Sequence, residues 1–305
     1  MSVARPSLLL LGCDGQVGWE LQRTLACLGE VTSTSLCGRY GLGLDLLDRD
    51  AVASAVRRHR PDFIINAAAH TAVDKAESEI ELSARLNAEA PGLLGSLAAE
   101  QGATLIHYST DFVFAGDADR PYQEEDAASP VSVYGQTKLE GEQRLLATGA
   151  DTLIFRTSWV YGNHGHNFMN TMLRLFKERD CLRVVDDQIG APTWSRMIAE
   201  VTAQVVNRLG FAPSDSAHLR GIYHLTAGGE TSWCGFAQRI LELSGEACRI
   251  DPILTRDYPT PARRPAYSVL DNTKLNKTFG IKLPDWKLSL AQCLADRLAR
   301  MKYLG

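Results

Sequence analysis

The sequence predicts an α/β fold in which a doubly wound parallel sheet is joined by a smaller, interleaved C-terminal lobe. The first observation is an alternation of short apolar runs with amphipathic stretches through the first half of the chain. The second is a glycine loop directly after the first apolar run, and the third is a change of rhythm after about residue 160. Alternating strands and helices favour a parallel sheet with helices on both faces.

Each expected element of the first half follows from its apolar pattern. Five apolar runs have the length of buried strands: residues 7–11, 31–35, 62–66, 103–108 and 152–157. Four stretches between them carry apolar residues at helical spacing: residues 16–28, 49–59, 76–100 and 133–147. After residue 160 the connections become richer in Pro, Gly and Trp, and long irregular segments of this kind commonly build a substrate lobe.

Composition and charge exclude several function classes. Of the 305 residues, 45% are hydrophobic and 22% are charged, which is ample for a buried core. The formal net charge of −4 argues against a nucleic-acid partner. No run of 18 apolar residues occurs, so we expect no membrane span. Seven scattered cysteines without a Cys-x-x-Cys pair predict reduced thiols in a cytoplasmic protein.

A glycine loop connects the first strand to the first helix. Gly12, Gly15 and Gly18 are spaced as G-x-x-G-x-x-G, with Gln16 and Val17 inside the loop. Glycines here permit a tight turn and a close approach of the backbone to a pyrophosphate, which then lies on the positive end of the helix. A plain turn that merely needs glycine is the alternative. The strand before and the helix after favour a Rossmann-like nucleotide site.

The second strand bears on the choice between NADH and NADPH. In dinucleotide-binding folds it normally supplies an acid that binds the ribose of NAD. The strand at 31–35 ends without an acid, and Arg39 follows, where it would pair with a 2′-phosphate. We therefore favour NADPH and leave NADH open, because Arg39 also fits a solvated loop. Asp45, followed by Leu46, would accept a hydrogen bond from the adenine amine.

Small residues follow the third strand. Ala67, Ala68 and Ala69 leave room for a flat ligand close to the backbone. In an open parallel sheet, ligands collect at this carboxyl edge. A helix contact through small residues is the alternative interpretation. Thr71 opens the next segment, which would touch substrate.

Tyr134 and Lys138 lie four residues apart, on one face of the helix predicted at 133–147. A phenol beside an ammonium is what a proton donor and a cation that lowers its pKa require. So short a motif also arises by chance, and its meaning depends on the surrounding loops. Ser109 and Thr110, after the fourth strand, supply hydroxyls that would donate to a carbonyl oxygen beside the tyrosine. A Ser/Thr turn that satisfies its own backbone is the alternative.

These motifs predict the division of labour along the chain. We expect residues 1–160 to form an NADP(H)-binding domain that carries the catalytic Thr110, Tyr134 and Lys138. Residues 161–305 would form mainly a substrate-binding lobe, with late elements returning to the sheet.

In this order, the motifs resemble those of the extended short-chain dehydrogenase/reductase superfamily and, within it, of the dTDP-4-dehydrorhamnose reductases. The resemblance covers essentially the whole chain. It is carried by the longer strings at residues 15–21, 66–77, 108–114, 155–161, 190–193 and 258–265.

The resemblance implies NADPH-dependent reduction of the 4-keto group of dTDP-4-dehydro-6-deoxy-L-mannose to dTDP-L-rhamnose, for cell-surface polysaccharide synthesis. Tyr134 would donate a proton to the C4 oxygen, and Thr110 would polarise the carbonyl. Lys138, with the oxidised nicotinamide, would lower the pKa of Tyr134 from its ordinary value of about 10 and would hold the nicotinamide ribose. The protein would act on this small molecule as a monomer or a homodimer.

Further residues would contact the sugar nucleotide by their place in the family pattern. Arg264 would neutralise the diphosphate, which its planar guanidinium suits. Core packing is an equal alternative for Trp159. The full set is Thr71, Val73, Ser109, Thr110, Trp159, Asn167 and Arg264.

Other activities of the superfamily are alternatives to reduction. Dehydratases carry an Asp-Glu pair after the catalytic threonine, whereas Thr110 is followed here by Asp111 and Phe112, so elimination lacks its base. An epimerase and another nucleotide-sugar reductase remain alternatives. A non-catalytic, NADP-binding regulatory subunit of the same fold is a third, although Tyr134 and Lys138 are both present.

No metal site is predicted. Some members of the family use Mg²⁺ held by carboxylates at a dimer contact, and Glu20 matches one of those positions. Arg196 stands where a second glutamate would be expected, so the residues do not support the ion. His164 and His166 lack a nearby third ligand.

Overall fold

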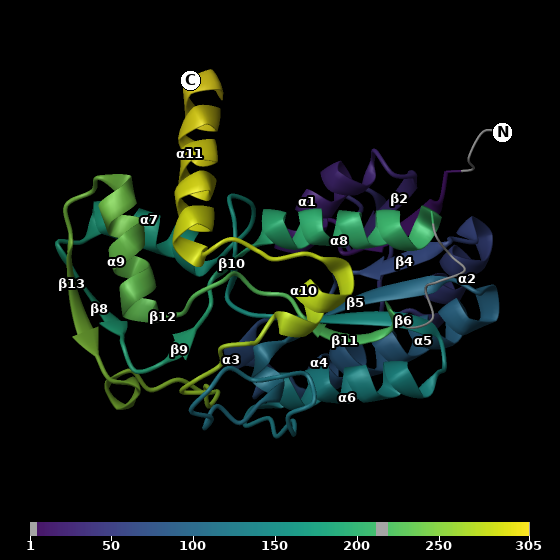
Figure 1. Ribbon diagram of the computed structural model, residues 1–305, viewed down its shortest axis with the longest axis horizontal. Helices are drawn as coiled ribbons and strands as arrows, with labels where there is room; N and C mark the ends of the chain where they lie inside the picture. Colours follow the sequence, from purple (N-terminus) through teal and green to yellow (C-terminus); the bar gives the residue numbers. More distant parts are fainter. Residues whose placement is uncertain (1–4, 212–218, 305) are drawn as a thin grey trace.

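The computed structural model describes residues 5–211 and 219–304. Within them, seven parallel strands form one sheet in the order β11-β6-β5-β4-β1-β2-β3 (Figure 1). Their bounds are β1 (Ser7–Leu11), β2 (Glu30–Ser35), β3 (Leu42–Gly43), β4 (Phe63–Asn66), β5 (Thr104–Thr110), β6 (Asp151–Thr157) and β11 (Gly221–His224). All five predicted strands are present, and the predicted doubly wound fold class is confirmed.

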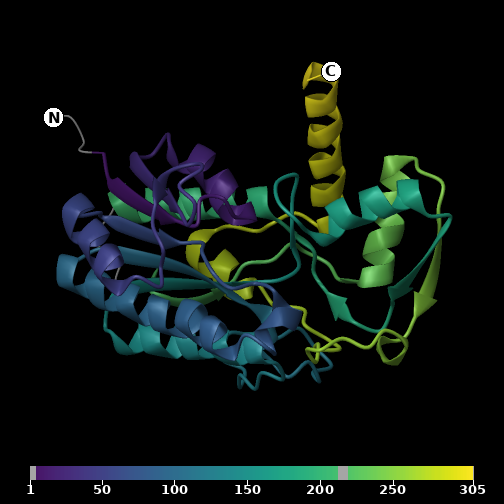
Figure 2. The same cartoon turned by 180° about the vertical axis from the view of Figure 1, so that it is seen from behind.

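Helices cover both faces of this sheet. One face packs against α1 (Gln16–Leu25), α8 (Ser195–Phe211) and α10 (Thr273–Phe279). The other packs against α2 (Arg49–His59), α5 (Ala90–Gln101) and α6 (Val133–Ala147). Figure 2, which views the molecule from behind, shows this face. In β1, Leu8 and Leu10 enter the first core, and Leu9 and Leu11 enter the second. The strand is therefore apolar without interruption because both of its faces are buried.

The predicted helix at 76–100 is divided in the structure. It consists of α3 (Val73–Ala76), α4 (Ile80–Ala84), the π-helical turn η1 (Arg85–Glu89) and α5. The wide turn brings Asn87 inward, where its side chain accepts from His70 N–H at 2.8 Å and donates to His70 C=O at 3.1 Å. The break thus serves a long-range contact, which helical spacing in the sequence does not reveal.

The second half of the chain builds a lobe beside the carboxyl edge of the sheet (Figure 1). Its core holds Met169, Phe236 and Leu290, from the three main helices of the lobe. The helices are α7 (Phe168–Glu178), α9 (Trp233–Ser244) and α11 (Trp286–Leu304). Three two-stranded sheets complete it: β7 (Val160–Tyr161) with β10 (Thr193–Trp194), β9 (Ile189–Gly190) with β12 (Thr231–Ser232), and β8 (Cys181–Val185) with β13 (Arg249–Ile253). The described residues also contain the 3₁₀ turns η2 (Asp111–Val113), which follows β5, and η5 (Thr255–Asp257), which follows β13.

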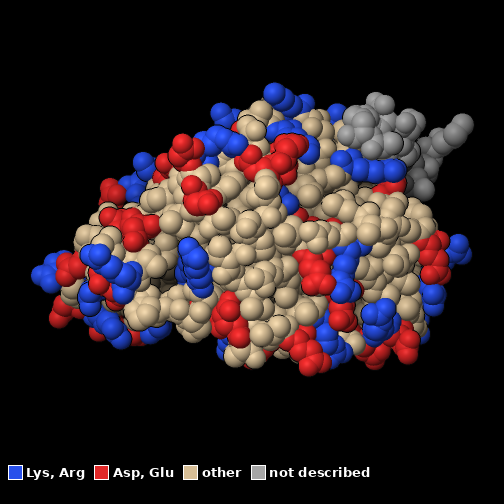
Figure 3. Space-filling view, turned by 90° about the horizontal axis from the view of Figure 1, so that it is seen from below, with Lys and Arg blue, Asp and Glu red and all other residues tan. Residues whose placement is uncertain are grey.

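The chain crosses between the two units several times. β11 pairs with β6, and α8 packs on α1, although both elements lie after residue 160. The interleaving predicted with the fold class is therefore present, while the domain boundary at residue 160 stays a prediction. No helix of the described residues is long and apolar enough to cross a membrane. On the face shown in Figure 3, the described basic side chains lie among acidic ones rather than in one broad patch.

The sheet topology predicts the position of a ligand site. β1 pairs with β2 on one side and with β4 on the other. The strand order reverses between β1 and β4, so the connections leaving these two strands turn in opposite directions. A crevice opens outside the carboxyl ends at such a switch point.

Candidate active site

A cavity of about 960 Å³ lies at the carboxyl edge of the sheet, between the sheet and the lobe. This volume is at the upper end for small-molecule sites and suits a dinucleotide together with a sugar substrate. The predicted cofactor residues that line it are Gly12, Gly15, Gln16, Val17, Asp45, Leu46, Ala67, Ala68, Ala69, Tyr134 and Lys138. The predicted substrate residues that line it are Thr71, Val73, Ser109, Thr110, Trp159, Asn167 and Arg264. Gly18 and Arg39 are not among its lining residues.

The glycine loop has the geometry of a phosphate cradle. Gly12 has a φ of +80°, and a Cβ there would lie 2.7 Å from the backbone nitrogen of Ala68. A Cβ at Gly18 would overlap the carbonyl oxygen of Gly12, so this residue serves the packing of helix on loop. Gly15 caps α1 without a side-chain hydrogen bond. The first N–H groups of α1 are thereby left for an anionic ligand, and the residues fit a pyrophosphate.

One end of the cavity, where we expect the adenosine, is formed by the ends of β2 and β3. Ser35 and Leu36 line it, and neither is acidic. Asp45 lines it as well, and its carboxylate accepts from Leu47 N–H at 2.9 Å. The Arg39 guanidinium lies 5.2 Å from the centre of the Tyr40 ring. Pairing of Arg39 with a 2′-phosphate stays a prediction.

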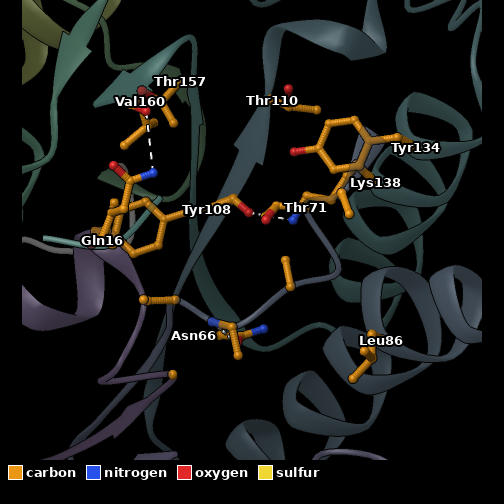
Figure 4. Close-up of a pocket in the computed structure, with 18 of the residues that line it drawn as sticks. Gln16, Asn66, Thr71, Leu86, Tyr108, Thr110, Tyr134, Lys138, Thr157 and Val160 are labelled. Atoms are coloured by element: carbon orange, nitrogen blue, oxygen red, sulfur yellow. Dashed lines mark hydrogen bonds between the residues drawn. The ribbon is translucent and has the colours of Figure 1, made fainter. Parts of the chain in front are cut away.

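Tyr134 and Lys138 are presented by the first two turns of α6. Ser132 caps this helix by accepting from Gly135 N–H at 3.2 Å. A Cβ at Gly135 would overlap the Phe112 carbonyl oxygen, so the glycine brings the helix against η2, the turn that follows β5. Figure 4 shows the Tyr134 hydroxyl pointing into the cavity, with Lys138 beside it. Lys138 Nζ donates to the Tyr108 carbonyl oxygen at 2.6 Å.

Burial sets the charge states of this pair. It raises the pKa of Tyr134 to about 12, and a side-chain hydrogen bond with Thr110 acts in the opposite direction. Burial lowers the pKa of Lys138 to about 8, against the attraction of Glu142. The phenol therefore keeps its proton at neutral pH, as an acid catalyst requires. Lowering of the Tyr134 pKa by Lys138 and the oxidised cofactor stays a prediction.

Hydroxyl groups at the ends of β5 and β6 face the same space. Thr110 donates to Asp111 Oδ1 at 3.0 Å and accepts from Phe112 N–H at 3.2 Å. Within the described residues, the buried hydroxyls of Ser109 and Thr157 have no hydrogen-bond partner. Buried polar groups normally have partners, so these two orphans indicate ligand contacts. Nothing in the local sequence singled out Thr157.

A loop of the lobe closes over the glycine loop. Gln16 donates to the Val160 carbonyl oxygen at 3.4 Å and accepts from the Asn167 side chain at 3.0 Å (Figure 4 for Gln16 and Val160). Asn167 also caps α7 by accepting from Asn170 N–H. His164 contacts the Asp14 carbonyl oxygen through Nε2 at 2.9 Å and stacks on Trp19. These contacts join the cofactor cradle to the lobe.

Two tryptophans form the wall of the cavity on the lobe side. Trp159 and Trp233 stack with ring centres 3.6 Å apart and planes within 7°. Trp159 has a φ of +46°, which is uncommon for a bulky residue, and its ring lies against Gly190. Trp233 is a site residue that sequence reasoning missed. It is the first residue of α9, 74 positions after Trp159, and only the tertiary fold brings the two together.

Arg264 reaches the cavity from the Pro-rich segment before α10. It forms an ion pair with Asp74 at 2.9 Å, and the Asp74 carboxylate also accepts from Ala262 N–H at 3.3 Å. The Nε atom of Arg264 is buried and has no partner among the described residues. Its guanidinium thus retains a free donor for an anionic substrate, although a role at a diphosphate stays a prediction.

The residues around Glu20 do not fit a metal ion. Glu20 is 4% exposed and pairs with Arg196 at 3.2 Å, and Arg196 pairs with Asp296 at 3.0 Å. The guanidinium occupies the space between the two carboxylates. No group of three or more His, Cys, Asp or Glu side chains suited to a metal occurs in residues 5–211 and 219–304. Mg²⁺ is not supported.

Comparisons with known proteins identify the family. The family described as the RmlD substrate binding domain matches residues 6–299. A dTDP-4-dehydrorhamnose reductase of Escherichia coli strain K12 is 46% identical, over 95% of this chain and 97% of that protein. The chain belongs to the dTDP-4-dehydrorhamnose reductase family. The resemblance drawn from the sequence motifs is confirmed.

Solved structures of the dTDP-4-dehydrorhamnose reductase family share the whole fold. A crystal structure of the Clostridium acetobutylicum protein superposes with a TM-score of 0.88 at 38% identity, and covers 96% of this chain and 99% of that one. A Bacillus anthracis dTDP-4-dehydrorhamnose reductase in complex with NADP superposes with a TM-score of 0.87 at 32% identity, with the same coverage. Both the sheet and the lobe therefore belong to the family architecture.

Proposed function

We propose that this protein catalyses the NADPH-dependent reduction of dTDP-4-dehydro-6-deoxy-L-mannose (dTDP-4-dehydrorhamnose) to dTDP-L-rhamnose. Membership of the dTDP-4-dehydrorhamnose reductase family supports the activity, and the NADP complex of the Bacillus anthracis relative supports the cofactor. The observation that carries the proposal is the convergence of Thr110, Tyr134 and Lys138 on one cavity next to a phosphate cradle.

The roles of the chain's own residues follow from their positions. NADPH, when bound, supplies the hydride for C4 of the sugar. The glycine loop and the start of α1 would hold its pyrophosphate. Tyr134, which is protonated at neutral pH, would give its proton to the C4 oxygen as negative charge develops there. The Thr110 hydroxyl, which donates to Asp111 Oδ1 in this structure, would turn to donate to the same oxygen, and Lys138 would supply positive charge close by.

Substrate recognition is proposed for the lobe side of the cavity. The face of Trp159, backed by Trp233, would pack against the sugar ring. Arg264 would pair with the diphosphate, since its Nε remains available. On the sheet side, the orphan hydroxyl of Ser109 in β5 would hydrogen-bond to the sugar.

The experiment is a coupled assay of NADPH oxidation with the keto sugar generated by upstream enzymes and with product analysis. Tyr134→Phe should lose roughly 10²- to 10⁴-fold in kcat while NADPH still binds, because only the proton donor is removed. Tyr223→Phe is the matched control, since its hydroxyl donates to the Leu219 carbonyl oxygen away from the cavity. Turnover that is insensitive to Tyr134→Phe would argue against the proposed acid.

Two other functions predict different outcomes of this assay. An epimerase would recycle its cofactor, so sugar would change without net NADPH consumption. A regulatory subunit would bind NADPH and leave the sugar unchanged. Phe112, whose ring lies 5.6 Å from that of Tyr134, stands where a dehydratase would carry its glutamate, so we expect no elimination product.

The setting of the enzyme is proposed from its surface and thiols. All seven cysteines lie in the described residues and are free thiols, which supports a reducing cytoplasmic location. We propose a monomer or a homodimer without a bridging metal, because Arg196 already neutralises Glu20. Light scattering with and without a chelator would distinguish these states.

A further inference from the structure

Three buried residues form a chain of contacts behind the catalytic pair. Asn66 Nδ2 lies 3.1 Å from His107 Nδ1, and Lys138 Nζ lies 3.3 Å from Nε2 of the same ring. They come from β4, β5 and α6, and their exposed fractions are 1%, 1% and 2%. At this depth, each polar atom depends on the partners that the protein gives it.

The orientation of the Asn66 amide is fixed at its other end. Its oxygen, Oδ1, accepts from Ala68 N–H at 3.2 Å (Figure 4 for Asn66). The NH₂ group therefore faces His107, and Nδ1 of the ring must accept from it. Burial, together with the charge of Lys138, lowers the pKa of His107 well below its ordinary value, so the ring is neutral. A neutral ring that accepts at Nδ1 carries its proton on Nε2.

This arrangement conflicts with a charged lysine. The Nε2–H bond points at Lys138 Nζ, and an ammonium has donors but no acceptor. A neutral amine has a lone pair and would accept the bond. If Lys138 is charged, Nε2 must accept instead, and the ring proton must lie on Nδ1, opposite the Asn66 NH₂ group. The neutral lysine therefore satisfies both contacts of His107, whereas the charged lysine keeps its own contact and sets Nδ1–H against the Asn66 NH₂ group.

The other charged groups near Lys138 do not remove this conflict. Glu142, one turn further along α6, raises the pKa of Lys138. Its carboxylate is held by Arg156 of β6 through bonds of 2.9 and 2.6 Å. On the cavity side lies the phenol of Tyr134, which is neutral at pH 7. The Tyr108 carbonyl oxygen accepts one Lys138 N–H in either charge state.

We propose that His107 is a positioning residue for Lys138, and that its ring tautomer, biased by Asn66, changes together with the charge of Lys138. In the charged state the ring proton lies on Nδ1 and Nε2 accepts from the ammonium. On titration Lys138 gives that shared proton to Nε2, and the Nδ1 proton leaves to water in the cavity that Asn66 lines. Asn66, His107 and Lys138 together lose one proton, and the contact with Asn66 favours the neutral form of Lys138.

The consequence for catalysis rests on the proposed function. Lys138 is needed as a cation beside Tyr134. The contacts from Asn66 through His107 set the pH at which Lys138 loses its charge. The pH above which the rate of keto-sugar reduction falls should therefore follow the tautomer of His107. His107 itself acts only through Lys138 and Tyr134 and does not touch the reacting atoms.

Nuclear magnetic resonance of the ¹⁵N-labelled free protein tests directly whether the His107 tautomer and the charge of Lys138 change together. Long-range ¹H–¹⁵N correlation identifies which ring nitrogen carries the proton, with His107 assigned from its loss in His107→Gln. Side-chain resonances of Lys138 are assigned in the same way from Lys138→Met. We expect the proton on Nδ1 at low pH and on Nε2 at high pH, with the same midpoint as Lys138. A single tautomer throughout, or two separate midpoints, would overturn the proposal.

Asn66→Asp reverses the bias, because a carboxylate accepts from Nδ1–H. The ring should then keep its proton on Nδ1, and the midpoint of Lys138 should rise by roughly one pH unit. Asn207→Asp, on the exposed side of α8, is the matched control and should change neither value. An Nε2–H ring that persists in Asn66→Asp would contradict the assigned role of Asn66.

Activity gives a second readout. The alkaline limb of the kcat profile should move upward by the same amount in Asn66→Asp, whatever its absolute rate. If the wild-type protein does not reduce the keto sugar, the proposed function fails. The resonance measurements still decide whether the His107 tautomer changes together with the charge of Lys138. If the wild-type protein does reduce the keto sugar and the alkaline limb does not move, the link between His107 and catalysis is wrong.

Discussion

At the scale of single residues, the site combines polar groups whose charge states are set by burial. Tyr134 keeps its proton at neutral pH, burial lowers the pKa of Lys138, and the buried carboxyl of Asp111 acts on Tyr134. The sequence named Tyr134 and Lys138 because their spacing places them on one helix face. It did not indicate their burial or the contact with His107, because these depend on the packing of α6 against β5, and His107 lies 31 residues before Lys138.

Asp111→Asn should stabilise the protein at pH 8. Burial raises the pKa of Asp111 from 3.8 to about 6, against hydrogen bonds from Ser268 and Thr110. A pKa raised on folding gives stability that is fully present below the unfolded value and is lost as pH rises through about 6. The cost of keeping the charge above pH 6 is about 3 kcal/mol.

Thermal unfolding at several pH values measures this effect. The advantage of Asp111→Asn over the wild type should shrink as the pH falls from 6 toward 4, where the wild-type carboxyl is protonated. Asp119→Asn, in an exposed loop, is the control and should show no such pH dependence. A destabilised Asp111→Asn protein at pH 8 would mean that the charge itself is used by the fold.

At the scale of elements, α1, α8 and α11 are tied together by one charged cluster. Arg196 of α8 pairs with Glu20 of α1 and with Asp296 of α11, and Arg300 also pairs with Asp296. Helix α11 stands out from the rest of the molecule in Figure 1, and this cluster contacts it near the middle of its length, at Asp296. The sequence indicated the departure at Arg196, but not that the guanidinium bridges two helices.

Treatment with a metal chelator should leave the stability and the activity of the protein unchanged. A chelator should alter neither the thermal midpoint nor the rate, because Arg196 supplies the positive charge between Glu20 and Asp296. Arg196→Ala should cost about 3 kcal/mol of unfolding free energy, since it leaves the buried Glu20 carboxylate with fewer partners.

The converse substitution tests the same cluster. Arg196→Glu would place three carboxylates together, and Mg²⁺ should then raise its thermal midpoint, which carboxylate oxygen ligands favour. The wild-type protein in the same titration is the control. A midpoint of the wild type that rises with Mg²⁺ and falls with a chelator would refute the absence of a metal role.

Gly190→Ala should lower kcat/KM for the keto sugar and leave the affinity for NADPH unchanged. A Cβ at this position would lie 2.5 Å from the Trp159 ring, so the stacked pair with Trp233 must move. We expect kcat/KM for the keto sugar to fall on the order of 10- to 100-fold, as for other small misplacements in a site. Steady-state kinetics and NADPH titration separate the two effects.

The matched control for that change is Gly210→Ala, near the end of α8. Its nearest neighbour would be Phe63 at 3.7 Å, which is ordinary contact, so kinetics should be unaffected. An equal loss of NADPH affinity in Gly190→Ala would show that the lobe side of the cavity also holds the cofactor.

At the scale of the whole molecule, the sheet and the lobe close on one cavity. The contacts of Gln16 with Val160 and Asn167 join the cradle to the lobe, and Arg264 with Asp74 joins the lobe side to α3. Cofactor bound in the cradle would thus stabilise both units together.

NADPH should therefore raise the thermal midpoint of the whole protein in one transition. At a concentration 100 times its Kd, the stabilisation is about 2.7 kcal/mol, or roughly 5 °C for a chain of this size. NADH at equal concentration should give a smaller shift if Arg39 or a neighbouring group binds the 2′-phosphate. Gly12→Ala, strained at a φ of +80°, should lose the response to both. Equal shifts with the two cofactors would remove the expected preference for NADPH.

Local sequence by itself determined the strands, the glycine loop, the Tyr134–Lys138 pair and the family. These features depend on the order of neighbouring residues, so periodicity and spacing predict them. The tertiary structure decided the divided helix at Asn87, the stacking of Trp233 on Trp159, the bridging role of Arg196 and the chain from Asn66 to Lys138. Each of these joins residues far apart along the chain, and their contacts exist only once the sheet and the lobe have packed.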